Sequence, residues 1–209
     1  MPKHVSGSVA QQRRNVCEEA ARLMLEHGLR DFQRAKEKAC ARFGIPMNQA
    51  WLPSNHEIEQ ALLIRQKLFH SNSVGKRVNV MLRLALELMQ LLEQFRPRLS
   101  GALPRGHLTD RTPVELHLFS DEVETVSLQL DEHAIPYEYF DKRFRKRADE
   151  YLYVPGFRFF ADEVPVELLV FNCKAERQAP LCPVTGRPMA RANMNKVREL
   201  LTEGFEVTL

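Results

Sequence analysis

The feature that most constrains the fold is a change of pattern at Pro97. Before it, apolar residues recur at helical spacing, and after it short apolar and aromatic runs alternate with turn residues. The two patterns differ because a helix face repeats every three to four residues, whereas a strand face repeats every second residue. We therefore predict an α+β chain, with a helical domain over residues 1–96 and a domain with a mixed β-sheet and flanking helices over 97–209.

The first 96 residues are predicted to form four helices. Each has a residue with a known capping role: a glycine follows the first two, a Ser-x-x-Glu capping box at Ser54–Glu57 precedes the third, and Pro97 follows the fourth. The expected spans are about 9–27, about 31–43, from 55 onward and about 74–95.

The remaining residues are predicted to form strands and two further helices. Aromatic and β-branched residues mark the strand-like runs 114–119, 135–140, 151–154, 157–161 and 164–171. Helical periodicity marks 121–133 and 193–201. The segment 177–189 contains three prolines and a glycine, which indicates an ordered loop between the last strand and the last helix.

Composition excludes several classes of protein. The chain is 44% hydrophobic and 27% charged, and no run approaches the roughly 18 uninterrupted apolar residues of a membrane span. The first residues lack the apolar core of a secretion signal, so we expect a cytoplasmic protein that does not bind membranes. The four cysteines form no Cys-x-x-Cys pair, which argues against a zinc ribbon or thioredoxin-like motif and favours buried free thiols.

Charge is distributed unevenly along the chain. Residues 1–100 contain 16 Lys and Arg against 9 Asp and Glu, a net charge of +7, whereas residues 101–209 contain 14 against 18, a net charge of −4. A basic first half suggests an anionic partner, and an acidic second half suggests cations. Solvated helix surfaces are an equally simple source of the basic residues.

The segment from Leu99 to Leu116 carries the main functional prediction. Gly101, then Arg105-Gly106, then Pro113-Val114-Glu115 follow the end of the fourth predicted helix. This order resembles the signature of the polymerase-β-like nucleotidyltransferases, in which a Gly-Ser pair, an Arg-Gly turn and an Asp-x-Asp strand follow one another. The later run 164–171, which contains Glu167, resembles the strand that brings the third carboxylate of that family.

The resemblance implies a domain for nucleotidyl transfer. Such an enzyme uses two Mg²⁺ ions held by carboxylates, and alternate residues of a strand point to the same face, so both can reach one metal cluster. The resemblance assigns catalysis and metal binding to Glu115 and Glu167, with Asp110 as a substitute ligand. It assigns the phosphate-facing turn to Gly101, Arg105 and Gly106.

The sequence departs from the family pattern at two positions. Pro113 stands where the first aspartate is expected, and Ala102 stands where the serine is expected. We therefore expect a degenerate member that binds a nucleotide or nucleic acid and has lost, or nearly lost, transfer activity. Two alternatives remain: an active Mg²⁺-dependent nucleotidyltransferase that modifies RNA, protein or a small molecule, and a non-catalytic adaptor for a protein or RNA partner.

His117 follows Glu115 by two residues and shares its face of the predicted strand. It can ligate a metal or donate a hydrogen bond to a ligand, and the simpler interpretation is one ordinary hydrogen bond at the strand end. Glu115 and Glu167 have a similar alternative, as glutamates at a solvated strand edge.

The densest basic cluster is Lys142-Arg143-Phe144-Arg145-Lys146-Arg147, and four tyrosines lie near it in the sequence. Basic residues next to aromatic ones suit a single-stranded nucleic acid, through phosphate contacts and base stacking. We predict that Arg143, Arg145, Lys146 and Arg147 bind nucleic acid; the alternative is a solvated hairpin tip.

Two other motifs are incomplete. Gly75-Lys76 lacks the remaining residues of a phosphate-binding P-loop. The helices around Gly28 are similar to the opening of helix-turn-helix repressors, but prolines and Trp51 stand where the recognition helix should begin. Neither function is predicted.

Overall fold

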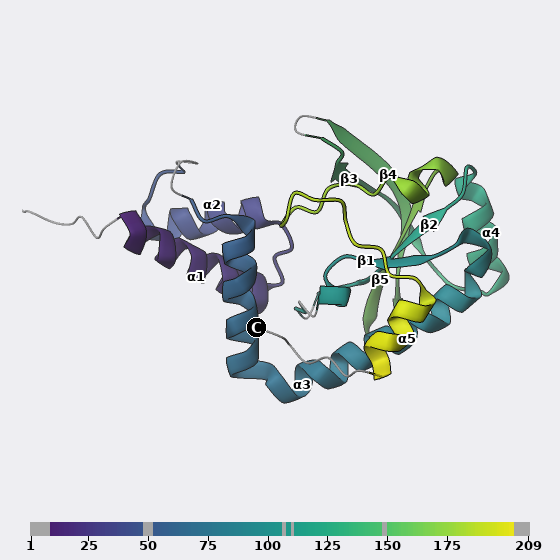
Figure 1. The fold of residues 1–209 in the computed structure, drawn as a ribbon, viewed down its shortest axis with the longest axis horizontal. Coiled ribbons are helices and arrows are strands. Elements are labelled where there is room, and N and C mark those ends of the chain that lie inside the picture. Colours follow the sequence, from purple (N-terminus) through teal and green to yellow (C-terminus); the bar gives the residue numbers. More distant parts are fainter. Residues whose placement is uncertain (1–8, 48–51, 106–107, 110, 148–149, 203–209) are drawn as a thin grey trace, which may run out of the picture. The chain divides into compact units, whose positions relative to one another are not determined.

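A computed structural model describes residues 9–47, 52–105, 108–109, 111–147 and 150–202, and for residues 67–74 it describes the backbone alone. The described residues form a mixed α+β structure, as predicted, in which a helical region precedes a five-stranded sheet (Figure 1). The chain divides into two compact units, Met1–Ser71 and Asn72–Leu209.

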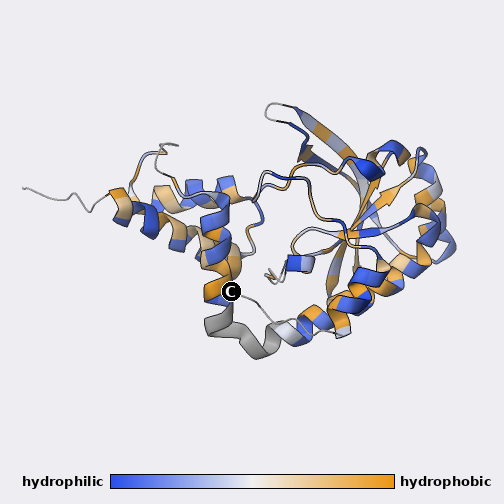
Figure 2. Cartoon of the chain, in the orientation of Figure 1, coloured by the Kyte–Doolittle hydropathy of each residue, from blue (hydrophilic) through white to orange (hydrophobic). Residues whose placement is uncertain are grey.

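The 1–71 unit contains three helical segments, namely α1 (Val9–His27), α2 (Phe32–Phe43) and the first part of α3 (Asn55–Leu91). Apolar and polar residues are interleaved along these helices (Figure 2), so that each buries one stripe. The stripes meet in a core made of Val16, Ala20, Ala21, Met24, Ala35, Ala39, Cys40, Ile58 and Leu62.

The helix ends in this unit follow the sequence signals. Gly44 ends α2 in the left-handed conformation at φ 64°, which a glycine adopts without a Cβ penalty. The predicted capping box starts α3: the Ser54 N–H donates to Glu57 Oε2 at 2.7 Å, and the Glu57 N–H donates to Ser54 Oγ at 3.2 Å. Both predictions are confirmed.

Helix α3 is a single helix of 37 residues where the sequence analysis predicted two. The second of the two predicted helices was expected to begin at about residue 74, and Ser71, Asn72, Ser73 and Gly75 around that point are poor helix formers. These residues cost a helix only about 1 kcal/mol each at most, and no proline interrupts 55–91. Apolar packing at both ends of the helix outweighs that local cost.

The 72–209 unit contains the sheet. Its strands lie in the order β1-β2-β5-β4-β3, with β2 and β5 parallel and the other neighbours antiparallel. The strands are β1 (Arg98–Ser100), β2 (Val114–Phe119), β3 (Glu138–Arg145), β4 (Tyr151–Ala161) and β5 (Val164–Phe171), and the helices that follow β2 and β5 are α4 (Val123–Glu132) and α5 (Met194–Thr202).

One face of the sheet packs against helices. Val114, Leu116 and Leu118 of β2 are fully buried there, in one core with apolar residues of α3, α4, α5 and β5. The second part of α3 supplies much of this core, from Val78 to Met89. That packing explains why the two units divide inside α3, whereas the sequence analysis placed the boundary at 96/97.

The strands differ from the predicted ones in three places. The short strand β1 was not predicted. The predicted strands 151–154 and 157–161 form one strand, β4, because Pro155 and Gly156 continue it. Gly156 is required there, since a Cβ at this position would lie 2.5 Å from the Leu168 carbonyl oxygen. Strand β3 extends to Arg145 and includes most of the basic cluster.

The structure also bears on the predictions about membrane spans and cysteines. Among the described residues, no helix is long and apolar enough to cross a membrane. The four cysteines are free thiols, of which Cys40 and Cys182 are buried and Cys17 and Cys173 are partly buried.

Candidate functional site

The two glutamates singled out by the sequence lie side by side. In the parallel pairing of β2 and β5, Glu115 is opposite Glu167, and both side chains are buried on the face of the sheet away from the helices. Strand alternation causes this, because Leu116 and Leu168 point into the helix-covered core. The sheet therefore brings Glu115 and Glu167 to one face, and their assignment to catalysis and metal binding stays a prediction.

Lys142 lies between the two carboxylates. Its Nζ is 2.5 Å from Glu115 Oε2 and 2.8 Å from Glu167 Oε2. It comes from β3, on the same side as Phe140 and Phe144, and its side chain is 25% exposed. A buried carboxylate needs a counter-charge, and this ammonium serves two of them.

The other oxygen of Glu115 contacts His117, and the donors around this ring fix its tautomer. Arg191 Nε can only donate, and it lies 2.9 Å from His117 Nδ1. Nδ1 therefore accepts, and the proton of the neutral ring is on Nε2, which donates to Glu115 Oε1 at 3.1 Å. The alternative interpretation of His117, an ordinary hydrogen bond, fits this geometry.

Together Glu167, Lys142, Glu115, His117 and Arg191 form a continuous chain of contacts, which we call the charge network. Burial raises the pKa of Glu115, but Lys142 and His117 outweigh it, so that this pKa lies below its usual range. Burial lowers the pKa of His117, which keeps the ring neutral. Burial also disfavours the charged Lys142, but Glu115 and Glu167 raise its pKa overall.

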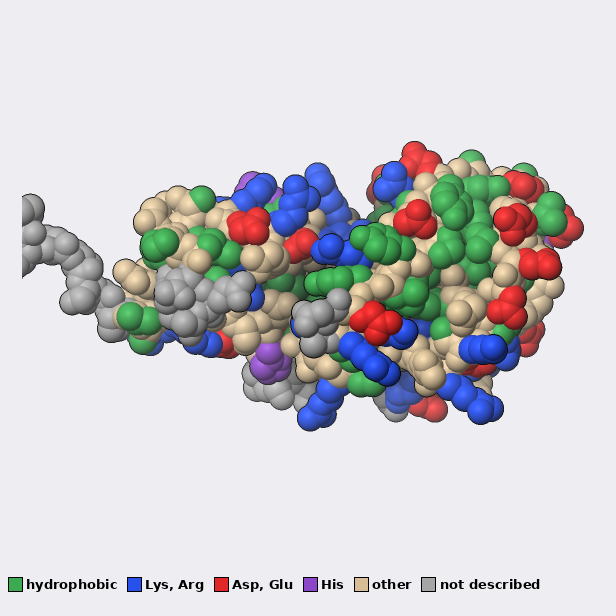
Figure 3. Space-filling view, turned by 90° about the horizontal axis from the view of Figure 1, so that it is seen from above, with side chains coloured by type: hydrophobic (Ala, Val, Ile, Leu, Met, Phe, Trp, Pro, Cys, Tyr) green, Lys and Arg blue, Asp and Glu red, His purple; other side chains and the backbone are tan. Residues whose placement is uncertain are grey.

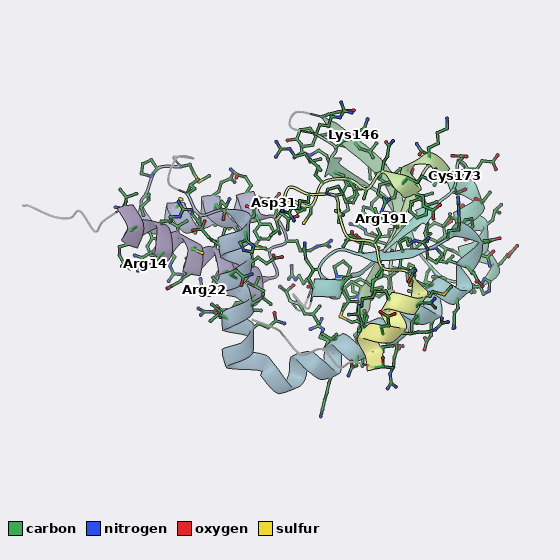
Figure 4. The ribbon with its side chains drawn as sticks, in the orientation of Figure 1. Arg14, Arg22, Asp31, Lys146, Cys173 and Arg191 are labelled. Carbon is green, nitrogen blue, oxygen red and sulfur yellow. The ribbon has the colours of Figure 1, made fainter. Side chains whose placement is uncertain are left out.

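Arg191 enters the network from the segment between β5 and α5. This tail segment (177–192) bonds to both edge strands of the sheet: Leu181 N–H donates to the Arg145 carbonyl of β3 at 2.8 Å, and Ala192 exchanges two 2.8 Å bonds with Leu99 of β1. Arg191 lies near β1 and β2 in Figure 4. The tail segment thus crosses the face that carries the network and helps to bury it.

Arg191 is itself firmly held. Its Nη1 donates to the Ala175 carbonyl at 2.6 Å, and its guanidinium lies about 5 Å from the rings of Phe119 and Phe171. Burial and the nearby Arg98 lower the pKa of Arg191 to about 10, so that it stays charged at neutral pH. A fixed cation therefore stands at the end of the network opposite Glu167.

Gly101 and Arg105, predicted to face phosphate, have clear structural roles. Gly101 adopts φ 79°, and a Cβ there would lie 3.2 Å from the Cβ of Glu115, so that only glycine fits easily against this glutamate. Arg105, at the end of a short 3₁₀ turn (Leu103–Arg105), donates to Cys182 Sγ of the tail segment at 2.9 Å. Gly106 and Asp110 lie outside the described residues.

Sequence reasoning missed Lys142 as a site residue, along with Arg191. Lys142 was grouped with the basic cluster, although strand alternation with Phe140 and Phe144 separates it from Arg143 and Arg145. This two-residue alternation was the sequence pattern that could have identified Lys142 as an inward-pointing residue. Arg191 had no such signal, because its position depends on how the tail segment crosses the sheet.

The basic residues of the β3–β4 hairpin and those of the 1–71 unit differ in their ion pairs. Arg143 and Arg145 are exposed on the face of β3 opposite Lys142, and Lys146, labelled in Figure 4, pairs with Glu150 at 2.6 Å. Arg147 follows and is exposed. In the helical unit, by contrast, several arginines are held by glutamates of the same unit: Arg13 by Glu57, Arg22 by Glu19 and Glu26, Arg42 by Glu19, and Arg65 by Glu26.

The chemistry of the network is that of a closed ionic cluster. Within the described part of the chain, no group of three or more His, Cys, Asp or Glu side chains is placed to hold a metal ion. The carboxylate oxygens that face each other are already bonded to an ammonium. The arrangement suits charge compensation inside the sheet rather than proton transfer to an external ligand.

No protein-family model matches the chain, and neither a curated protein nor a solved structure matches it. The function is therefore inferred from geometry and chemistry.

Proposed function

We propose that the 72–209 unit is a degenerate nucleotidyltransferase-like domain that binds a nucleotide or nucleic acid without transferring a nucleotidyl group. The observation that carries the proposal is the position of Lys142 between Glu115 and Glu167. In an active member of that family, paired carboxylates on neighbouring strands hold divalent cations. Here an ammonium from the protein takes up the same oxygens.

The residues present do not fit a two-metal site. Mg²⁺ requires near-octahedral oxygen ligands, and a two-metal cluster needs several carboxylates. Pro113 offers no side-chain ligand at the position of the first aspartate, and Glu115 Oε1 already accepts from His117. We therefore derive no catalytic step that uses a metal.

Support for ligand binding comes from arginines on the elements that hold the cluster, of which Arg143 and Arg145 lie on the face of β3 opposite Lys142. Arg105 lies at the turn that the resemblance assigns to phosphate, and Arg143 and Arg145 are exposed on the nearby hairpin. Phosphate groups are recognised by guanidinium groups through paired hydrogen bonds. A nucleotide and a nucleic acid share this chemistry.

The proposal is tested by titrating the full chain with Mg²⁺, Mn²⁺ and each of the four triphosphates, separately and together, and measuring the melting temperature. We expect stabilisation by a nucleotide or an oligonucleotide with or without metal, since a ligand at a hundredfold excess over its Kd adds about 2.7 kcal/mol. In parallel, pyrophosphate release should stay at the background rate with Mn²⁺ and candidate RNA acceptors.

Glu167→Gln and Glu163→Gln form a matched pair for this assay, because Glu163 is exposed in the turn between β4 and β5. Pyrophosphate release that disappears in Glu167→Gln but persists in Glu163→Gln would replace the proposal with the active enzyme. Loss of mononucleotide binding in Arg105→Ala, with oligonucleotide binding intact, would assign the turn to phosphate. If no nucleotide or oligonucleotide binds, the proposal is wrong and the remaining alternative is a non-catalytic adaptor for a protein partner.

A further inference from the structure

Strands β3 and β4 form a hairpin whose two faces differ in burial. On one face, Phe144 and Val154 are buried in an aromatic cluster with Phe119 and Phe171. The other face carries alternating arginine and tyrosine residues, which we call the Arg–Tyr face: Tyr139, Arg143, Arg145, Tyr151 and Tyr153. Strand alternation therefore separates Phe144 from the arginines on either side of it.

The tyrosines of this face are unusually exposed. Tyr139 is 59% exposed, Tyr151 51% and Tyr153 65%. Three of the six exposed large hydrophobic residues in the described part of the 72–209 unit are the tyrosines of this face. Figure 3 shows hydrophobic side chains gathered on one face of this unit, with charged side chains around them. Exposed aromatic rings that occur together mark an interaction surface.

The rings and cations of the face are ordered by one another. Arg143 pairs with Tyr153 across the strands, and Arg145 pairs with Tyr151. The Arg143 guanidinium lies 4.6 Å from the centre of the Tyr151 ring, and Tyr139 packs edge-on against the buried Phe157 at 5.7 Å. A ligand that stacks on Tyr139 or Tyr151 therefore meets a side chain that already has limited freedom.

The charge of the hairpin favours an anionic ligand. Five of the six residues from Lys142 to Arg147 are basic, and only Lys142 is used by the charge network. The charge of Lys146 is partly compensated by Glu150. On the Arg–Tyr face itself, Asp141 is the acidic residue, between Tyr139 and Arg143 on β3. Arg143 and Arg145 therefore dominate the charge around the tyrosines.

We infer that the Arg–Tyr face binds single-stranded nucleic acid, with tyrosine rings stacking on bases and arginines contacting phosphates. Bases in a duplex are stacked on each other and hide their faces, whereas a single strand can present them to aromatic side chains. Arginine and tyrosine are also enriched in protein interfaces, so it is the excess of positive charge on this hairpin, rather than its residue types, that favours nucleic acid over a protein partner. The inference rests on the proposed function, since it names nucleic acid as the ligand.

The test measures binding of the full chain to a fluorescent 20-nucleotide oligouridylate and to an RNA duplex of the same length, by anisotropy. We expect preference for the single strand. Tyr153→Ala should weaken that binding roughly 5- to 150-fold, the range for loss of one base stack, and Tyr153→Phe should retain it. Arg143→Ala should reduce the slope of log K against log salt by about 0.7.

Phe160→Ala is the matched control, because Phe160 is an aromatic of the same strand, 72% exposed, at the end away from the hairpin tip. It should bind as the unchanged protein does, and melting temperatures of all variants check folding. Equal affinity for the duplex, or equally strong competition by polyglutamate, would overturn the inference in favour of a general anion surface.

One outcome separates this inference from the proposed function. Oligouridylate binding that is insensitive to Tyr153→Ala would overturn the inference and leave nucleic-acid binding elsewhere on the chain. Absence of binding to oligonucleotides and mononucleotides alike would overturn both. Single-strand preference with selective loss in Tyr153→Ala supports both.

Discussion

One face of the five-stranded sheet is covered by helices, and the other carries the charge network beneath the tail segment. On the first face, Leu116 is fully buried in a large apolar core. On the second, Glu115, the preceding residue of the same strand, contacts Lys142 and His117. One strand therefore packs nonspecifically with apolar residues on one side and makes specific pairwise contacts on the other.

The difference lies in how each face tolerates a missing partner. An apolar core loses stability in proportion to the volume removed, because every contact is weak and many remain. A buried ion pair stabilises little compared with apolar residues of the same volume, but removing one partner leaves an uncompensated charge. Removing one side chain should therefore lower the free energy of unfolding more on the network face than on the helix-covered face. On the network face this loss should also depend on pH.

The largest effect is expected from Lys142→Met. It leaves Glu115 and Glu167 adjacent and buried without a counter-charge, so the free energy of unfolding at pH 7 should fall by roughly 3–5 kcal/mol. Urea unfolding followed by far-UV circular dichroism measures this. The triple variant with Glu115→Gln and Glu167→Gln should recover part of the loss. If the triple variant is less stable than Lys142→Met, the carboxylates are not the cause.

The fluorescence of Trp51 gives a second measurement of unfolding in the same urea titration. It is the only tryptophan of the chain, and its position in the sequence assigns it to the 1–71 unit. Lys142→Met should move the circular dichroism transition more than the fluorescence transition. Equal shifts in both would mean that the two units unfold together.

Leu116→Ala tests the helix-covered face, with an expected loss of roughly 2–5 kcal/mol from the cavity left in the core. Unlike the loss in Lys142→Met, it should be the same at pH 5 and pH 8, since no titratable group is involved. Leu128→Ala, at a position that is 61% exposed on α4, is the control and should stay within about 0.5 kcal/mol. A strong pH dependence in Leu116→Ala would mean that the two faces are coupled.

The two faces also differ in how well the sequence predicted them. Helical and strand periods located β2, β5 and the capped helices, because side-chain direction follows locally from the backbone. The pairing of Glu115 with Glu167 was not predicted, because it depends on the parallel register of β2 and β5, which neither run encodes by itself. The position of Arg191 depends on contacts of the tail segment with β1 and β3, about 45 to 90 residues away, and no local pattern encodes such contacts. Lys142 was missed because a basic run looks the same whether one of its members points inward or not.

The smallest effect is expected from His117→Phe, which keeps a ring against Phe171 but removes the bonds to Glu115 and Arg191. Leaving these groups unsatisfied should cost roughly 1–3 kcal/mol at pH 7. The pH profile separates this from a packing defect. In the folded chain burial lowers the pKa of His117, so the unfolded chain takes up the proton first, near pH 6.5, and the unchanged protein should lose stability as the pH falls through that value.

The pKa of Glu115 is also lowered on folding, and the stability it contributes is lost only as the pH falls below the ordinary carboxyl value of about 4.3. The two groups therefore act in the same direction but in separate windows. His117→Phe should remove the loss near pH 6.5 and keep the one below about pH 4.3, whereas His56→Phe, at an exposed position of α3, should keep both. If the loss near pH 6.5 survives in His117→Phe, the neutral ring of His117 is not its source, and the network face would be no more sensitive to pH in that window than the helix-covered face.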